Sequence, residues 1–106
     1  TERFLWEAGF CLSCGRKAAV RDDVNYAMGS AIRTVCAWTQ VLFALNGRYQ
    51  MNEKGSLAAA DRMPTAPVRL EARVGEACRE IAAGRGGTAW RILEDLHAEI
   101  GILAAP

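Results

Sequence analysis

Apolar residues recur along this chain at three- and four-residue steps, the spacing that places them on one face of an α-helix. No segment alternates apolar and polar residues between turn signals, so we expect no β-strands. The pattern predicts four main helices at about residues 3–20, 24–46, 67–83 and 89–104, and a short helix at about 53–62. Short connections favour an all-α fold, namely an antiparallel four-helix bundle with an additional short helix.

Each main helix has a stripe of residues that we expect to face the core. The second helix is the most apolar, because few polar residues interrupt the stretch from Ala31 to Leu45. A helix that is apolar on nearly all sides is expected to be surrounded by other helices. The expected core residues are Phe4, Leu5, Ala8, Leu12, Ala19, Trp38, Val41, Leu42, Phe43, Leu45, Leu70, Val74, Ala77, Cys78, Ile81, Trp90, Leu93, Leu96, Ile100 and Leu103.

Several residues mark where the helices begin and end. Asp22 or Asp23 can cap the second helix, because a carboxylate accepts hydrogen bonds from the first backbone N–H groups. Gly47 stands where a left-handed residue is expected after that helix. Pro67 suits the first position of the next main helix, and Thr88 is a candidate cap for the last one.

Composition indicates an ordinary globular domain. The 106 residues predict one domain, with 51% apolar and 24% charged residues and a net charge of +1. This charge gives no reason to expect a nucleic acid or a membrane surface as partner. No uninterrupted apolar run is long enough for a membrane span, and residues 1–10 do not resemble a signal peptide, so we expect a cytoplasmic protein. Because Thr1 is not a methionine, we expect a processed or trimmed chain, or a piece of a longer protein.

The chain has four cysteines, at positions 11, 14, 36 and 78. Cys11 and Cys14 have the spacing of zinc ligands, but no second pair with this spacing follows. Both lie within a predicted helix, where residues three apart simply share a face. We therefore expect free structural thiols and assign no metal site.

The only histidine supports one enzymatic alternative. Arg91 and His97 are separated by five residues, a loose pattern that resembles the ribonuclease motif of HEPN domains. Those domains are helical bundles in which two chains join at the RNA. In this alternative His97 would be the acid or base and Arg91 would hold the phosphate. However, the two positions are about 240° apart on a helix. The ordinary interpretation is that His97 is a surface residue that complements the helix dipole.

The three tryptophans suggest packing rather than a stacking surface for bases. Trp6, Trp38 and Trp90 lie one per predicted main helix, at spacings that we interpret as core-facing. Aromatic side chains contribute large areas to protein cores. We therefore expect all three to be packing residues.

A polar stretch follows directly after the most apolar helix. Between Asn46 and Gly55, seven side chains can form hydrogen bonds, and three of these are charged. A helix cap followed by a solvated turn explains the glycines, but not the aromatic residue or the number of charges. Cationic and amide side chains can hold a phosphate or a carboxylate. The candidate binding residues are Asn46, Arg48, Tyr49, Asn52, Glu53 and Lys54.

The same stretch resembles a known family. Gln40–Asn46, followed by Arg48-x-x-x-Asn52-Glu53-Lys54-Gly55, is similar to the C-terminal helical domain of bacterial nucleotidyltransferase-like proteins. These proteins belong to the DNA polymerase beta-like superfamily and are close to the minimal and kanamycin-type enzymes. Residues 15–35 also resemble the first two helices of that domain, through Arg16-Lys17-Ala18-Ala19 and Arg21-x-Asp23-Val24. The resemblance covers about residues 5–80.

The resemblance implies a non-catalytic substrate-binding or interaction domain. The family's catalytic domain, which this chain lacks, would pack beside it in cis or in trans. That domain uses Gly-Ser and Asp-x-Asp to bind magnesium and a nucleotide triphosphate. This chain has Gly29-Ser30, but no acidic residue follows until Glu53, so cofactors are implied only for the parent enzyme.

We infer the roles within the polar stretch from the residues themselves. Asn46 and Tyr49 would brace the turn, whereas Arg48, Glu53 and Lys54 would meet the partner or an anionic ligand. The HEPN-like dimeric ribonuclease remains one alternative. A helical dimerisation or scaffold module, with a homodimer as partner, is the other.

Overall fold

The computed structural model describes residues 1–49 and 54–106, and these contain helices but no strand. The all-α prediction is therefore confirmed for this part of the chain. The candidate residues Asn52 and Glu53 lie outside the described residues. The five helices are α1 (Glu2–Val20), α2 (Val24–Leu45), α3 (Ser56–Asp61), α4 (Leu70–Ala82) and α5 (Gly86–Ala104).

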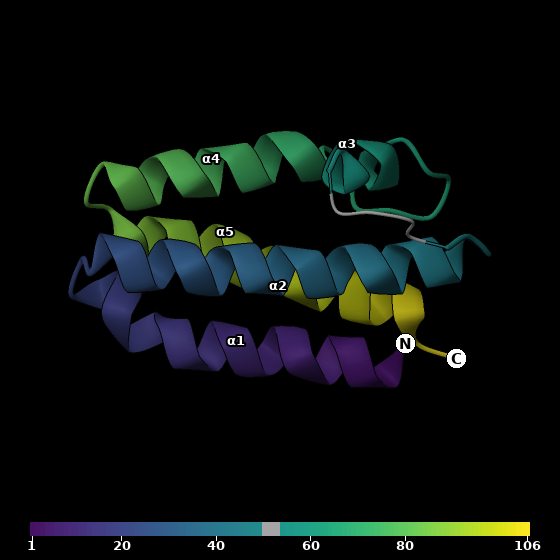
Figure 1. The fold of residues 1–106 in the computed structure, drawn as a ribbon, viewed down its shortest axis with the longest axis horizontal. Helices are drawn as coiled ribbons and strands as arrows, with labels where there is room; N and C mark the ends of the chain where they lie inside the picture. Colours follow the sequence, from purple (N-terminus) through teal and green to yellow (C-terminus); the bar gives the residue numbers. More distant parts are fainter. Residues whose placement is uncertain (50–53) are drawn as a thin grey trace.

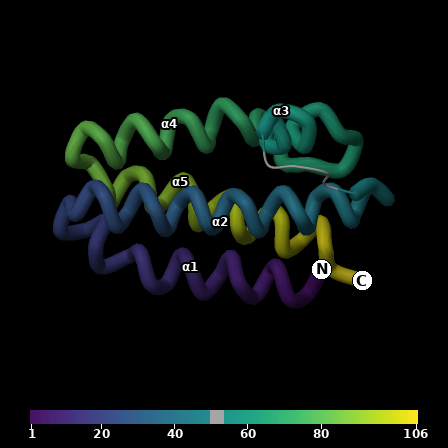
Figure 2. Tube along the Cα trace, viewed as in Figure 1, coloured from purple at the N-terminus to yellow at the C-terminus, as the bar shows by residue number. Residues whose placement is uncertain are grey.

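The helices form a bundle with α2 at its centre. In Figure 1, α1 and α4 lie on opposite sides of α2, and α5 lies behind it. The four long helices run lengthwise, and each one reverses the direction of the one before it. Helix α2 contacts all four others, and α5 contacts α1, α2 and α4. Figure 2 shows both chain termini at the same end of the molecule.

The predicted stripes form most of the core. Trp38, Leu42, Leu93, Leu96 and Ile100 are fully buried, in agreement with their helical spacing. Some positions at the edges of the stripes are only partly covered, because a stripe is wider than the contact that it forms. Partly buried are Phe4, Leu5, Leu45 and Cys78, and Leu103 is exposed.

Two expectations about apolar surfaces are wrong. Trp6 is 68% exposed, whereas Trp38 and Trp90 are buried. Trp6 lies on the opposite face of α1 from Ala8, which is buried, so its ring points away from the core. Helix α2 is also not surrounded, because Ile32 is 56% exposed. In Figure 1, α1 and α4 lie at its two sides and α5 lies behind it, and no helix lies in front.

Helix α2 is long and apolar enough to cross a membrane, by length and composition alone. Half of its most apolar stretch is buried among the other helices, and the core helix of a soluble protein meets the same criterion. The predictions of no membrane span and of a cytoplasmic location therefore stay predictions.

The predicted caps of α2 are confirmed. The side chain of Asp23 accepts a hydrogen bond from Tyr26 N at 3.3 Å. Gly47 is left-handed, with φ +68°, and Arg48 N donates to Phe43 O at 2.8 Å. This is the hydrogen-bond pattern of a Schellman motif, in which glycine is favoured because a side chain at positive φ is strained.

The starts of the other helices differ from the predictions. Helix α4 begins at Leu70 rather than Pro67, and Arg69 before it is left-handed with φ +56°. Helix α5 begins at Gly86, so Thr88 lies inside it and is not its cap. A distant residue explains the earlier start of α5, since Asp22 Oδ1 accepts a hydrogen bond from Gly86 N at 3.3 Å. That contact joins two turns far apart in the sequence, which local patterns do not reveal.

Helices α1, α2 and α5 meet closely at Gly15. A Cβ atom at this position would lie 2.5 Å from Trp90 Cζ2 and 2.6 Å from Ser30 Cβ. The indole of Trp90 also donates a hydrogen bond to Leu12 O at 2.9 Å, which fixes the ring against α1. The missing side chain at Gly15 therefore lets three helices share one contact.

We expect Gly15→Ala to destabilise the protein. Overpacking lowers the free energy of unfolding by about 1–3 kcal/mol, whereas replacing a helical glycine by alanine raises it by only about 0.5–1 kcal/mol. Gly101→Ala is the matched control, because nothing lies within 4 Å of a Cβ at that helical position. Thermal unfolding followed by circular dichroism should show a lower Tm for Gly15→Ala and an equal or higher Tm for Gly101→Ala. Equal Tm values for the two variants would contradict this packing.

Candidate functional site

Asn46 holds the end of α2 against the loop before α4. Its Nδ2 donates to Leu42 O at 2.7 Å and to Thr65 O at 2.9 Å. Its Oδ1 accepts from Thr65 N at 3.0 Å. Both ends of the amide are thus bonded to the backbone of the protein. This geometry agrees with the predicted bracing role of Asn46 and leaves its amide no free donor for a ligand.

The remaining described residues of the polar stretch point to solvent. Arg48 and Lys54 are exposed, and Tyr49 is 91% exposed. An exposed ring packs against nothing, so the expected bracing role of Tyr49 is wrong. Arg48 and Tyr49 follow the end of α2, and Lys54 precedes α3, on either side of residues 50–53 in the sequence. They offer two cations and one aromatic ring to a partner.

His97 is half-buried and linked to the centre of the core. Trp38 Nε1 donates a hydrogen bond to His97 Nδ1 at 3.0 Å, between α2 and α5. Because Nδ1 accepts, the proton of the neutral imidazole is on Nε2. Burial lowers the pKa of His97, so the neutral form dominates at pH 7. The expectation of a surface residue that complements the helix dipole is therefore wrong.

The geometry gives no support to the ribonuclease alternative. Arg91 is exposed on α5, whereas His97 faces α2 and the backbone of α1 at Gly9. The helix thus separates the two side chains, as their spacing predicts. A neutral imidazole with Nδ1 occupied must break its bond to Trp38 before that nitrogen can accept a proton.

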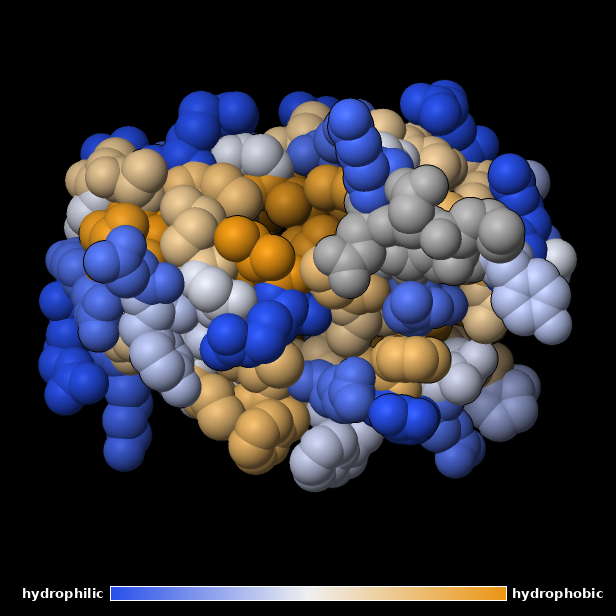
Figure 3. Space-filling model, in the orientation of Figure 1, coloured by the Kyte–Doolittle hydropathy of each residue, from blue (hydrophilic) through white to orange (hydrophobic). Residues whose placement is uncertain are grey.

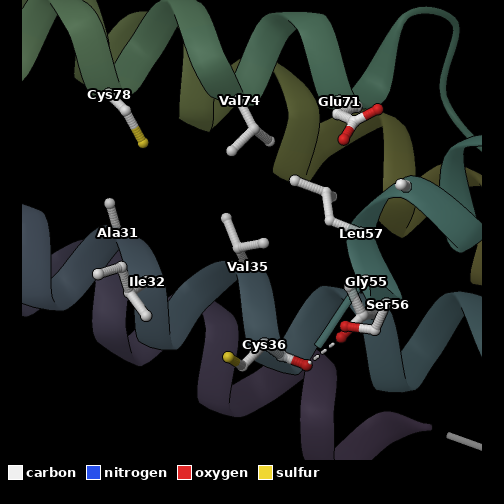
Figure 4. A pocket seen from close by; sticks show the side chains of 12 residues that line it. Ala31, Ile32, Val35, Cys36, Gly55, Ser56, Leu57, Glu71, Val74 and Cys78 are labelled. Carbon is white, nitrogen blue, oxygen red and sulfur yellow. Dashed lines mark hydrogen bonds between the residues drawn. The ribbon is translucent and has the colours of Figure 1, made fainter. Parts of the chain in front are cut away.

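The structure shows a groove that the sequence analysis missed. Residues of α2, α3 and α4 line this α2–α4 groove, whose volume is about 350 Å³. In Figure 4, Val74 and Cys78 of α4 point towards α2, and Leu57 of α3 lies at one end. Figure 3 shows hydrophobic surface hollowed in this region of the face, with hydrophilic residues around the edges. Its lining residues are Ala31, Ile32, Val35, Cys36, Thr39, Gly55, Ser56, Leu57, Ala58, Glu71, Val74 and Cys78.

A pair of aromatic rings stands on the opposite side of α2. Trp6 and Phe10 stack with centroids 5.3 Å apart and planes 9° apart, and both are more than half exposed. We call this pair the aromatic ridge. It borders an α1–α2 groove of about 740 Å³, and Ile32 and Cys36 of α2 also line this groove. The four-residue spacing of Trp6 and Phe10, away from the core stripe, was the signal available in the sequence.

The cysteines supply no metal centre within the described residues. None of the four forms a disulfide, and burial raises the pKa of Cys78. No group of three or more His, Cys, Asp or Glu side chains in residues 1–49 and 54–106 is placed to hold a metal ion.

No family model, curated protein or solved structure matches this chain. The resemblance to nucleotidyltransferase helical domains therefore rests on the quoted residues alone.

We expect Asn46→Asp to destabilise the protein. The carboxylate has the shape of the amide and still accepts from Thr65 N, but it cannot donate to Leu42 O or Thr65 O. The two carbonyl groups would then lose their donor and face a negative charge, which should lower the free energy of unfolding by about 1–3 kcal/mol. Asn25→Asp is the control, because the same change in the exposed first turn of α2 is favoured by the helix dipole. Urea unfolding should separate the two variants, and equal stabilities would exclude the bracing role.

The Trp38–His97 pair predicts a pH-dependent stability. The folded chain binds the imidazole proton less tightly than the unfolded chain, whose pKa is near 6.5. The stabilisation from neutral His97 is therefore complete above pH 6.5 and is lost as the pH falls through and below that value. Carboxyl groups such as Glu99, whose pKa the hydrogen bond from Arg73 lowers, titrate below this window.

His97→Asn tests this dependence, because Asn Oδ1 can still accept from Trp38 but does not titrate. We expect the free energy of unfolding of the wild type to fall more steeply than that of the variant between pH 7.5 and 5. Urea unfolding at several pH values measures both slopes. Parallel curves would show that the protonation of His97 is not linked to folding.

Proposed function

We propose that this chain is a non-catalytic helical interaction domain that binds a partner at the end of the bundle carrying Arg48, Tyr49 and Lys54. The carrying observation is that Tyr49 is 91% exposed, directly after the exposed Arg48 and near the exposed Lys54 in the sequence, where Asn46 braces the end of α2. Tyrosine and arginine are enriched at the centres of protein interfaces. A rigid support reduces the entropy lost when a partner binds.

The architecture that presents this end is part of the proposal. We interpret α1, α2, α4 and α5 as an antiparallel four-helix bundle, with α3 as the additional short helix. The reversal of direction between successive long helices supports this interpretation. Helix α3 packs on α2 and α4 beside the proposed binding end.

On the basis of the resemblance, we propose that the partner is the catalytic domain of a nucleotidyltransferase, in cis or in trans. The motif Arg48-x-x-x-Asn52-Glu53-Lys54-Gly55 carries this assignment. Magnesium and a nucleotide triphosphate would then bind to the partner's own carboxylates. The role of this domain would be to form one wall of the substrate cleft and to contribute cations there.

The test is site-specific crosslinking in the source cell. A photo-reactive amino acid replaces Tyr49, and mass spectrometry identifies the crosslinked peptides. We expect peptides of a domain with Gly-Ser followed by Asp-x-Asp, either upstream in the same chain or in a separate protein. The same amino acid at Val68, which is 76% exposed, is the control for non-specific capture.

The double variant Arg48→Ala with Lys54→Ala should lower the crosslinking yield several-fold, because both cations are part of the proposed contact. Arg79→Ala, an exposed cation on α4, should leave it unchanged. Equal crosslinking at positions 49 and 68 would refute an interaction surface at this end. A specific crosslink to a protein without the two motifs would keep the interaction domain and refute the nucleotidyltransferase.

A further inference from the structure

We propose that the α1–α2 groove binds a small aromatic carboxylate, with its ring against the aromatic ridge and its carboxylate at Arg33. This inference goes beyond the proposed function and does not rest on it, because it concerns the long face of the bundle rather than the end with Tyr49. The groove has a volume of about 740 Å³. Ligand pockets in proteins span about 300–1,000 Å³ and are mostly apolar, with a few polar groups that orient the ligand.

The walls of the groove offer apolar contacts from both helices. Phe4, Trp6 and Phe10 line it from α1, and Ile32 lines it from α2. Trp6 is 68% exposed, Phe10 is 55% exposed and Ile32 is 56% exposed, so all three have surface that a ligand can cover. Aromatic rings pair favourably in offset-stacked and edge-to-face arrangements. A planar aromatic body therefore suits this side of the bundle.

The register of α1 against α2 places the polar groups along the groove. A Cβ atom at Gly15 would lie 2.6 Å from Ser30 Cβ, so these two residues are level with each other. The two helices run in opposite directions (Figure 1), so a step back along α1 matches a step forward along α2. Arg33 is therefore level with about residue 12, and Gln40 is level with about residue 5. The groove has Arg33 at one end and Gln40 at the other.

Arg33 is the group that gives the groove its preference for an anion. Its side chain is exposed, and it belongs to none of the ion pairs within residues 1–49 and 54–106. Its guanidinium donates to Ser30 Oγ at 3.5 Å, the outer limit of a hydrogen bond, so this contact is weak. A guanidinium can donate two parallel hydrogen bonds to a carboxylate, which fixes both the position and the orientation of the ligand.

The one carboxylate in the groove does not oppose this assignment. Glu7 is already paired with Arg3, at an N–O distance of 3.8 Å. It is level with about residue 38, roughly 7–8 Å along the helices from Arg33. Helical side chains also lean towards the N-terminus of their own helix. Because α1 and α2 are antiparallel, Glu7 leans towards Arg3 and away from Arg33. The groove therefore has one cationic end and one end whose charges are compensated.

The experiment is a titration of the full chain, labelled with ¹⁵N, with naphthoate as the probe. The indole N–H signals of the three tryptophans are followed by NMR, and a Trp6→Phe variant assigns the signal of Trp6. Trp6 borders the groove, whereas Trp38 and Trp90 are buried elsewhere. We expect the Trp6 signal to shift and saturate, with much smaller changes at the other two. The neutral amide naphthamide should bind at least about tenfold more weakly, because it lacks the charge that Arg33 recognises.

Arg33→Gln tests the role of the guanidinium. We expect this variant to bind naphthoate at least about tenfold more weakly and to lose the preference for naphthoate over naphthamide. Arg91→Gln is the matched control, because Arg91 is exposed on α5 outside the groove and its loss should leave binding unchanged. Circular dichroism verifies that both variants fold, and the comparison of the two probes on the wild type does not depend on either variant.

Three results would overturn the proposal. The first is a Trp6 signal that does not saturate with naphthoate, and the second is equal affinity of the wild type for naphthoate and naphthamide. The third is a Trp6 signal that moves on dilution of the protein without ligand, because a second copy of the chain would then cover the groove. Naphthoate binding unaffected by Arg33→Gln would equally refute the assigned carboxylate position. None of these measurements involves the end with Tyr49, so the crosslinking result there is decided separately.

Discussion

The burial of α2 organises the whole bundle. The helix carries a nearly continuous run of apolar residues from Ala31 to Leu45, which must be removed from water. Trp38, Val41 and Leu42 reach full burial because α1, α4 and α5 pack on three sides. The other helices can then be amphipathic, since each needs only one stripe to face α2 or a neighbour.

The same constraint is not satisfied on the fourth side, and this explains the surface chemistry. Around Ile32 the open face of α2 continues into an apolar groove towards α4 and an aromatic ridge on α1. Extended apolar surface of this kind is typical of interaction sites and of ligand-binding grooves. The polar groups near the core are used internally: His97 accepts from Trp38, and Asn46 holds the loop at Thr65.

Local signals predicted the elements well where their causes are local. The Asp23 cap and the Gly47 turn both depend on hydrogen bonds within a few residues, so the sequence indicated them correctly. The predicted start of α5 was wrong because Asp22, 64 positions earlier, accepts a hydrogen bond from Gly86 N. Of the candidate site, the solvent exposure of Arg48 and Lys54 was foreseeable from their charge. The exposure of Tyr49 was not, because a ring beside an apolar helix can pack or project.

Residue spacing is enough to predict an all-helical chain, the residues of most core stripes and a polar stretch after α2, because these follow from a 3.6-residue period and from local turn chemistry. The packing of the helices was needed to show that Trp6 faces solvent, that His97 is bonded to Trp38 and that α2 is exposed at Ile32. Each of these depends on which helices become neighbours. That choice arises from shape and volume, such as the close approach at Gly15, and periodicity along the chain does not encode it.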